Sequence, residues 1–422
     1  MKSFFLYSKS LILKTFGAFI SFFLLIAIKD KIGINGFGKY AYIMSLATLL
    51  SSVLIFGSNN VILSEIPKIN SIGKFNHKLK IIRTIPIFFV LIYFLLSFFL
   101  FYYDLFSNLS DLILIGVISF LLSINKINMA IMRASNYPLT SELPELIIRP
   151  TLILLFIYFL KINNTLYVIL ILVFSLLISN ITGSIFISKK IINDYFLKVG
   201  SIKFLNHFKK TYLLVLISFL VILRENIEIY ILPFITNIEN VGYFKIYVQL
   251  ALLLSFGLQA VNIPQSYLIS KKLKTPFPNI NTELINGFKF SVLFFIGLCS
   301  VYLIVGNQLI SFFFGSDVID NFTSFKVMIL GQFIYVLIGP MGQTLILSKK
   351  IKYVFISLLI SVINAIIFGF LFINYFGLLG AAISYVFSLC VLHFTYSYFA
   401  YKYLKVKPSF LIFYDRFKRK GF

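Results

Sequence analysis

The chain alternates along its whole length between long apolar stretches and short segments rich in Lys and Arg. A helix needs about 20 mainly apolar residues to cross the roughly 30 Å hydrocarbon core of a bilayer. The stretches are continuously apolar instead of alternating at every second residue, so they predict helices and not the strands of a membrane barrel. Twelve spans are predicted, at 11–28, 41–64, 84–102, 112–134, 143–160, 165–188, 211–235, 241–268, 290–313, 324–347, 353–374 and 378–401.

Composition leads to the same fold class. The 422 residues are 59% hydrophobic, the mean hydropathy is +0.96 and the formal net charge is +24. A soluble protein of this length could not bury so much apolar surface, whereas a bilayer covers it. The first span is followed by Lys29, Asp30 and Lys31 and not by small residues that a signal peptidase would cleave, so we expect it to be retained. The prediction is an all-α polytopic membrane protein.

The basic residues predict an orientation. With both termini in the cytoplasm, 29 of the 38 Lys and Arg residues fall on the cytoplasmic side and 6, including Lys245, on the opposite side. Cytoplasmic loops carry such an excess of Lys and Arg. These loops would also attract anionic lipid headgroups, so membrane lipids are expected partners. Nucleic acid is not, because no soluble basic domain would hold it.

Twelve spans divide into two groups of six at the basic segment 189–210. A weak internal repeat supports this division, because the segment from Gly38 to Ser51 resembles the segment from Gly242 to Ser255 at a constant offset of 204. A parallel repeat of this kind is typical of transporters whose substrate path lies between the halves. The expected organisation is an N-terminal half (1–188), a cytoplasmic linker (189–210), a C-terminal half (211–401) and a basic cytoplasmic tail (402–422).

Charged residues within spans are costly, and they usually face a partner or a cavity. Span four carries Lys126 and Arg133, which lie on one helix face because seven residues are close to two turns. Arg133 could instead extend its side chain toward the cytoplasm. Lys126 lies deeper and is the better candidate for a transport pathway.

Span five carries Glu142, Glu145 and Arg149 on one face. The Glu145 and Arg149 pair has the favourable i, i+4 order, so a self-neutralised structural pair is the alternative to a functional site. Pro144 and Pro150 predict an irregular helix start, which membranes tolerate where it lines a cavity.

Span seven carries Arg224, Glu225 and Glu228 near the middle of the membrane. Arg224 and Glu228 are spaced to pair at i, i+4, which would leave Glu225 as a candidate site for a proton or sodium ion. A polar clamp between helices is the alternative.

Other chemistry is not indicated. The three histidines are scattered, no P-loop is present, and Gly36-Phe37-Gly38 is interpreted as a turn between spans one and two and not as a nucleotide fingerprint. Cys299 and Cys390 lie in separate spans and are expected to be unpaired thiols. We therefore expect no catalytic residue, no metal and no cofactor.

Three short motifs, in order, resemble a known family. They are IGINGFGKYAY at 32–42, NVGYF at 240–244, and Asn364 followed by YFGLLGAA at 375–382. They are similar to the junction motifs of Wzx-type polysaccharide flippases, within the multidrug/oligosaccharidyl-lipid/polysaccharide (MOP) exporter superfamily. Basic residues inside spans four, five and seven also fit this resemblance, which covers nearly the whole chain.

The resemblance implies transport and not enzymatic catalysis. The substrate would be an oligosaccharide repeat unit on undecaprenyl pyrophosphate, moved across a bacterial cytoplasmic (inner) membrane for O-antigen or capsule synthesis. The pyrophosphate would need cationic partners, for which Lys126, Arg133, Arg149 and Arg224 are the candidates. Glu225, Glu228 and Glu145 would be candidates for coupling to H⁺ or Na⁺. A polysaccharide polymerase or assembly complex would be a partner.

Four alternatives remain. A MATE-like multidrug exporter would share the fold but carry fewer cations within the membrane. A lipid II flippase would have fourteen spans instead of twelve. A polysaccharide polymerase would carry a long loop outside the cytoplasm, which this sequence lacks. A structural membrane protein would not need charges inside its spans.

Overall fold

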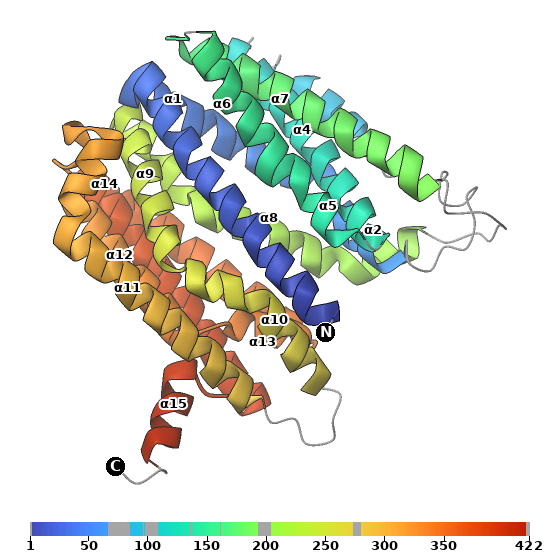
Figure 1. The fold of residues 1–422 in the computed structure, drawn as a ribbon, viewed down its shortest axis with the longest axis vertical. Helices are drawn as coiled ribbons and strands as arrows, with labels where there is room; N and C mark the ends of the chain where they lie inside the picture. The colour runs from blue at the N-terminus through green and yellow to red at the C-terminus, as the bar shows by residue number, and fades with distance from the viewer. Residues whose placement is uncertain are drawn as a thin grey trace. The chain divides into compact units, whose positions relative to one another are not determined.

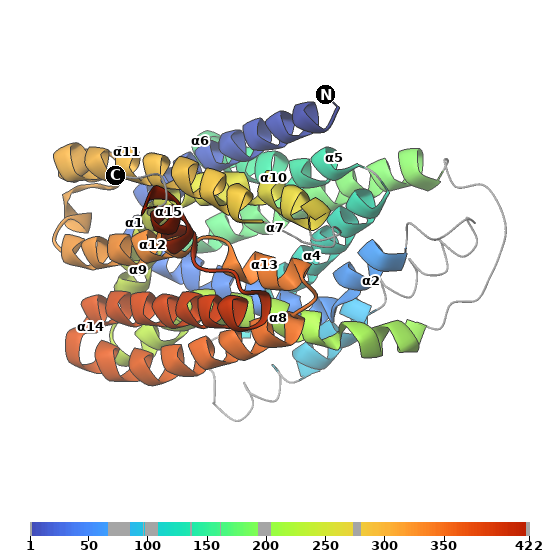
Figure 2. The ribbon, with the colours of Figure 1, turned by 90° about the horizontal axis from the view of Figure 1, so that it is seen from below.

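The computed structural model describes residues 2–65, 85–95, 97, 109–135, 137–160, 162–192, 204–272 and 280–418. Within these ranges every regular element is a helix, as Figures 1 and 2 show. The chain forms two compact units, Met1–Ile222 and Leu223–Phe422. The change of unit falls inside helix α8 (Phe204–Ile235). Much of the expected linker, at 193–203, lies outside the described residues.

The first unit is built around α1 and α4, which pack against each other and against the helices of spans five and six. The spans predicted at 112–134 and 165–188 coincide with α4 and with the helix Thr165–Phe186. The span predicted at 41–64 is interrupted by a turn at Phe56-Gly57, and only 85–95 and 97 of the span predicted at 84–102 lie among the described residues. The described helices that begin in this unit are α1 (Lys2–Ile55), α2 (Ser58–Glu65), Ile85–Leu95, α4 (Leu109–Ala134), α5 (Pro138–Leu143), α6 (Arg149–Phe159), α7 (Thr165–Phe186) and α8.

The second unit packs α12 (Phe322–Ile338) against both α9 (Ile238–Leu254) and the long helix α14 (Ile351–Leu404). Two of its predicted spans are bent. Helices α9 and α10 meet at 58° next to Ser255, and α12 and α13 meet at 41° at Gly339-Pro340. The further described helices are α9 (Ile238–Leu254), α10 (Phe256–Lys272), α11 (Asn281–Phe314), α12 (Phe322–Ile338), α13 (Met341–Leu347), α14 (Ile351–Leu404) and α15 (Ser409–Lys418).

Helices α1 and α14 are each 54 residues long. Helix α14 contains two predicted spans, whereas α1 contains the first predicted span and ends at Ile55, within the second. A glycine breaks each of them: Gly33 has φ 68° and ψ 177°, and Gly377 has φ 54° and ψ −127°. Only glycine adopts such backbone angles readily. The expected turn at Gly36–Gly38 is therefore wrong in position. The break is at Gly33, and Phe37 is completely buried within the following helix.

Contacts across Gly377 show that α14 is a hairpin of two antiparallel helices, which Figure 2 displays as two adjacent rods. The Ser361 hydroxyl donates to the carbonyl of Ser388 at 2.7 Å. The rings of Tyr353 and Tyr403 stack with their centroids 4.0 Å apart. Residues so far apart in one straight helix could not meet. The hairpin brings both of its ends, near 351 and 404, to the same end of the second unit.

Five of the described helices are long and apolar enough to cross a membrane, or up to seven if each bent pair is one span. The helix broken at Gly377 holds two of the spans predicted from sequence, and the helix broken at Gly33 holds the first predicted span and part of the second. Large apolar side chains remain exposed on these helices, among them Leu303 at 75% and Ile12 at 67%. Such exposure is expected where lipid covers the surface. The all-helical, multi-span fold class is confirmed.

Candidate functional site

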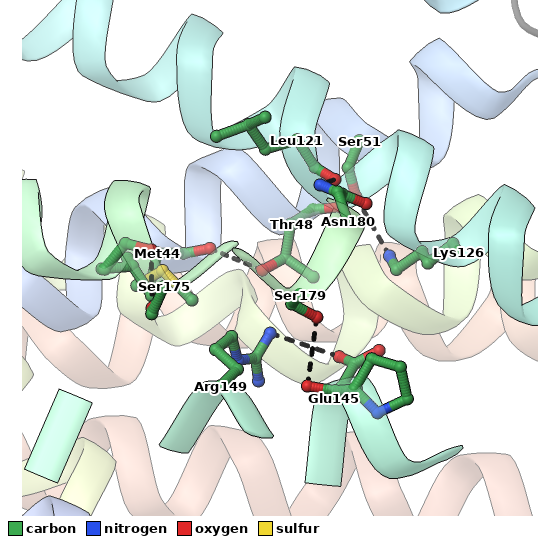
Figure 3. Close-up of polar contacts among 12 residues, drawn as sticks. Met44, Thr48, Ser51, Leu121, Lys126, Glu145, Arg149, Ser175, Ser179 and Asn180 are labelled. Atoms are coloured by element: carbon green, nitrogen blue, oxygen red, sulfur yellow. Dashed lines mark hydrogen bonds and ion pairs between the residues drawn. The ribbon is translucent and has the colours of Figure 1, made fainter. Parts of the chain in front are cut away.

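Lys126 joins α4 to α1 inside the first unit. Its Nζ donates a hydrogen bond to the Ser51 hydroxyl at 3.0 Å (Figure 3). Lys126 is half-buried, and its neighbour Asn125 is buried with an amide nitrogen that has no hydrogen-bond partner. Because the direct partner of Lys126 is a neutral hydroxyl, the positive charge is not cancelled at the point of contact.

The irregular start of span five is confirmed. Residues Pro144–Ile148 form a turn of π-helix between α5 and α6. Proline has no backbone N–H, so Pro144 and Pro150 interrupt the regular bonding of this segment. The Ser179 hydroxyl of α7 donates to the carbonyl of Pro144 at 3.1 Å, which ties the irregular turn to the next span.

This turn positions a second cation. The guanidinium of Arg149 lies 3.4 Å from the carboxylate of Glu145, so the predicted i, i+4 pair forms. Both side chains keep about a quarter of their surface exposed, at 20% for Arg149 and 26% for Glu145. The charges of Glu145 and Arg149 both act on Lys126. Figure 3 shows Lys126 and Ser51 on one side of Ser179, with Glu145 and Arg149 on the other. Two cations and one carboxylate therefore gather in one cluster, which we call the N-unit cluster (Lys126, Glu145 and Arg149).

Arg133 lies outside the N-unit cluster. Its guanidinium donates to the Ser141 hydroxyl at 3.3 Å and lies 3.5 Å from the carboxylate of Glu142. The Arg133 side chain is 41% exposed, at the end of α4. The sequence places Arg133 on the same face as Lys126, but the structure gives the two cations different partners.

The second unit holds a more deeply buried cluster. Arg224 of α8 is 5% exposed and Glu228 is completely buried. The guanidinium of Arg224 donates to the carbonyl of Tyr385 at 3.4 Å and lies 5.0 Å from the centroid of the Tyr385 ring. The Ser384 hydroxyl donates to a carboxylate oxygen of Glu228 at 3.2 Å. We call Arg224, Glu228, Ser384 and Tyr385 the C-unit cluster.

The predicted ion pair between Arg224 and Glu228 is wrong. Among the described residues no ion pair joins them, although the charge of Arg224 acts on Glu228. The guanidinium contacts Tyr385 and the carboxylate accepts a hydrogen bond from Ser384, so each charged group has a neutral partner from α14. One oxygen of Glu228 and the Nε of Arg224 are buried without a hydrogen bond.

The side chain of Glu225 is exposed. The charges of Arg224 and Lys245 both act on Glu225. The sequence assigned Lys245 to the side opposite the cytoplasm. The structure places Lys245 within helix α9, where its charge acts on Glu225.

Several polar residues of α14 were missed by the sequence analysis. Tyr385 and Ser384 contact the charged groups, and His393 is buried with its ring stacked on Tyr335 at 4.4 Å between centroids. The Gln332 amide donates to the Tyr385 hydroxyl at 3.5 Å. The recurrence of polar residues every three to four positions in an apolar span could have identified this face.

The candidates for other chemistry are few in the described part of the chain. Cys299 and Cys390 are free thiols, as predicted. No group of three or more His, Cys, Asp or Glu side chains that could hold a metal was found among the described residues.

No protein-family model matches this sequence, and comparison with curated proteins gave no match. Solved structures do resemble it. The lipid II flippase MurJ in an inward closed conformation matches with a TM-score of 0.66 and 18% identity, over 96% of this chain and 89% of MurJ. The MATE multidrug transporter DinF-BH matches with a TM-score of 0.65 and 16% identity, over 96% of this chain and 95% of DinF-BH.

A third structure is a MOP superfamily transporter from Pyrococcus furiosus, whose binding pocket is described as having reverse polarity. It matches with a TM-score of 0.65 and 12% identity, over 94% of both chains. At these identities the likeness establishes the fold and leaves the cargo open. The chain is a multi-pass helical membrane protein with the fold of the flippases and multidrug transporters of the MOP superfamily.

Proposed function

We propose that this protein is a flippase for undecaprenyl-pyrophosphate-linked oligosaccharide repeat units in a bacterial cytoplasmic membrane. It would move them by alternating access from the cytoplasmic to the outer leaflet, for synthesis of a surface polysaccharide such as O-antigen or capsule. One observation carries the proposal: the N-unit cluster holds two cations and one carboxylate, all partly exposed, on α4 and at the irregular start of the fifth span predicted from sequence.

The chemistry of the substrate fits this cluster. A pyrophosphate that enters a membrane loses its hydrating water and needs cations in its place. Hydrogen bonds between charged groups are stronger than those between neutral groups, so cationic side chains can replace the lost water. Arg149 offers a planar fork for phosphate oxygens, and Lys126 offers a compact ammonium. Glu145 would release Arg149 at modest cost, because their 3.4 Å contact is long and partly exposed. Arg224 and Arg133 are further candidate ligands, while the polyprenyl chain would stay in lipid.

Ion coupling is part of the proposal. Glu225 is the first candidate, because it is exposed and adjacent to Arg224 and Lys245. Glu228 and Glu145 are the others, and H⁺ and Na⁺ are the candidate ions. A carboxylate couples an ion to transport only if it binds that ion more tightly in one conformation than in the other. If Glu225→Gln leaves the dependence of transport on the gradient unchanged, Glu225 has no such role.

A MATE-like multidrug exporter is the second candidate. The observation in its favour is the pair of carboxylates Glu225 and Glu228 in the second unit, which could attract a cationic drug. The likeness of the chain to DinF-BH is about as strong as its likeness to MurJ. A polysaccharide polymerase is less favoured, and we propose one instead as a partner in an assembly complex.

The deciding experiment is depletion of the protein in cells. Undecaprenyl-linked intermediates would be extracted, and an impermeant sugar-modifying reagent would report which leaflet holds them. Complete single units trapped on the cytoplasmic leaflet are the expected result. Units that reach the outer leaflet but stay unpolymerised would indicate a polymerase. No accumulation, together with increased drug sensitivity, would indicate an exporter. Re-expression of Arg149→Gln and of Arg149→Lys would test whether the cation is needed.

A further inference from the structure

The hairpin of α14 gathers tyrosines and lysines at one end of the second unit. Tyr403 stacks on Tyr353, and the ammonium of Lys350 lies 5.7 Å from the centroid of the Tyr403 ring. The ammonium of Lys402 lies 5.6 Å from the same centroid. Further pairs are Lys402 with Tyr398 at 5.6 Å and Lys405 with Tyr401 at 5.8 Å. We call these seven residues the Tyr–Lys surface: Lys350, Tyr353, Tyr398, Tyr401, Lys402, Tyr403 and Lys405.

The Tyr–Lys surface carries unneutralised charge. None of the ion pairs in the described part of the chain includes Lys350, Lys402 or Lys405. The sequence from 402 to 420 contains seven Lys and Arg residues and a single acidic residue, Asp415. Asp415 is already paired with Lys407 at 2.7 Å. The surface is therefore strongly basic and has tyrosine rings beside its ammonium groups.

Helix α15 follows directly after α14 (Figure 1), and its two faces differ in burial. Ser409 and Ile412 are buried on one face, and the Phe413 ring lies 5.6 Å from that of Phe288 in α11. The other face exposes apolar side chains, with Tyr414 at 61% and both Phe410 and Leu411 above a third. A short helix with an exposed apolar face in a basic segment is typical of helices that lie in a membrane surface.

We propose that the Tyr–Lys surface and α15 form one binding surface for anionic phospholipid headgroups. Tyrosine rings favour the headgroup level of a bilayer, where one end of the ring is apolar and the other wet. Ammonium groups beside them would hold lipid phosphates, and each Lys near an anionic surface adds to the attraction. The exposed apolar face of α15 would lie at the boundary between headgroups and acyl chains. The positive charge would suit either an anionic phospholipid or an acidic protein. The aromatic and apolar side chains favour the phospholipid, because they need a hydrocarbon boundary.

Lipid binding at this surface would also act on a bend within the unit. The Ser409 hydroxyl lies against Gly339, so close that a Cβ added to Gly339 would collide with it. Gly339, with φ 80°, stands at the 41° bend between α12 and α13. Headgroups that fix α15 would therefore hold this bend in place. Lipid binding at this surface would not depend on which cargo the protein carries.

The test is hydrogen–deuterium exchange of the α15 amides, with the full-length protein in nanodiscs of phosphatidylcholine alone or with one quarter phosphatidylglycerol. We expect phosphatidylglycerol to slow exchange by at least about tenfold at low ionic strength, and less at high salt. The triple variant Lys350→Gln, Lys402→Gln, Lys405→Gln should lose most of this effect. The triple Lys→Arg variant should retain it.

A matched control removes three lysines elsewhere: Lys29→Gln, Lys31→Gln, Lys326→Gln. Lys31 and Lys326 also lie over aromatic rings, of Tyr158 and Phe322, so the control loses equal charge and similar contacts. It should keep the lipid effect. Exchange in α4, measured in the same samples, reports whether each variant is folded. Equal exchange of α15 in both lipids, or equal loss of the effect in the control, would overturn the proposal.

Discussion

The N-unit and C-unit clusters hold the charged residues of the predicted spans in opposite ways. In the N-unit cluster, Arg149 and Glu145 form an ion pair that keeps about a quarter of each side chain exposed. In the C-unit cluster, Arg224 and Glu228 are almost fully buried, and each is held by an uncharged partner on α14. The first arrangement leaves charge accessible to a ligand, whereas the second buries it beside neutral partners.

This difference separates two uses of intramembrane charge. A partly exposed pair exchanges partners at little cost, because water or a ligand can replace either side chain. Removing the partner of a buried charge destabilises the fold strongly, because water cannot solvate the charge that remains. We therefore expect substitutions in the N-unit cluster to change transport and substitutions in the C-unit cluster to change stability first.

The largest expected effect is that of Arg224→Met. Removing the guanidinium leaves the buried carboxylate of Glu228 without a nearby cation, which should cost about 3 kcal/mol of stability. Thermal unfolding of the purified protein in nanodiscs measures this loss. The double variant Arg224→Met, Glu228→Leu removes both charges and should recover much of the stability. If the double variant is no more stable than the single one, the two charges are not coupled.

The second effect concerns the glycines that divide the two 54-residue helices. Gly33→Ala and Gly377→Ala should each cost about 1–3 kcal/mol, because only the positive φ is strained and no atom lies within 4 Å of the added methyl group. Gly297→Ala is the control, since Gly297 lies in helical α11 with equally open space. Alanine should be neutral or stabilising there, by up to about 1 kcal/mol. Equal midpoints of thermal unfolding for all three variants would argue against a special backbone at the breaks.

The third prediction concerns two serines, Ser384, which donates to Glu228, and Ser51, which accepts from Lys126. Ser384→Ala removes a bond to fully buried Glu228 and should cost about 1.5–3 kcal/mol. Ser51→Ala removes the acceptor for half-buried Lys126 and should cost about 1 kcal/mol or less, because water can replace it. Thermal unfolding of both variants tests the ranking. The reverse order would mean that Lys126 is the more tightly held charge.

Sequence spacing succeeded in one cluster and failed in the other for a physical reason. Glu145 and Arg149 pair because both belong to one local segment, and the two prolines that distort it are visible in the sequence. Arg224 and Glu228 have the same spacing but do not pair, because Tyr385, 161 residues away, supplies a ring and a carbonyl. Local patterns predict the spans and their irregularities. The partners of a buried charge depend on tertiary packing, which spacing does not encode.

The smallest effect on stability, and the largest on transport, is expected for Lys126→Gln and Arg149→Gln. Both side chains are partly exposed, so each change should cost less than about 1 kcal/mol. Export of a pyrophosphate-linked substrate should fall at least about tenfold, because each cation would contribute a charge-assisted hydrogen bond worth about 1.5–3 kcal/mol. Arg133→Gln is the matched control, since it removes a similar charge outside the cluster and should have less effect. Efflux of a cationic drug should not fall in any of the three variants. If Arg133→Gln lowers export as much as the other two variants, the position of the charge within the N-unit cluster does not determine export. The contrast between accessible and buried charge would then not explain transport.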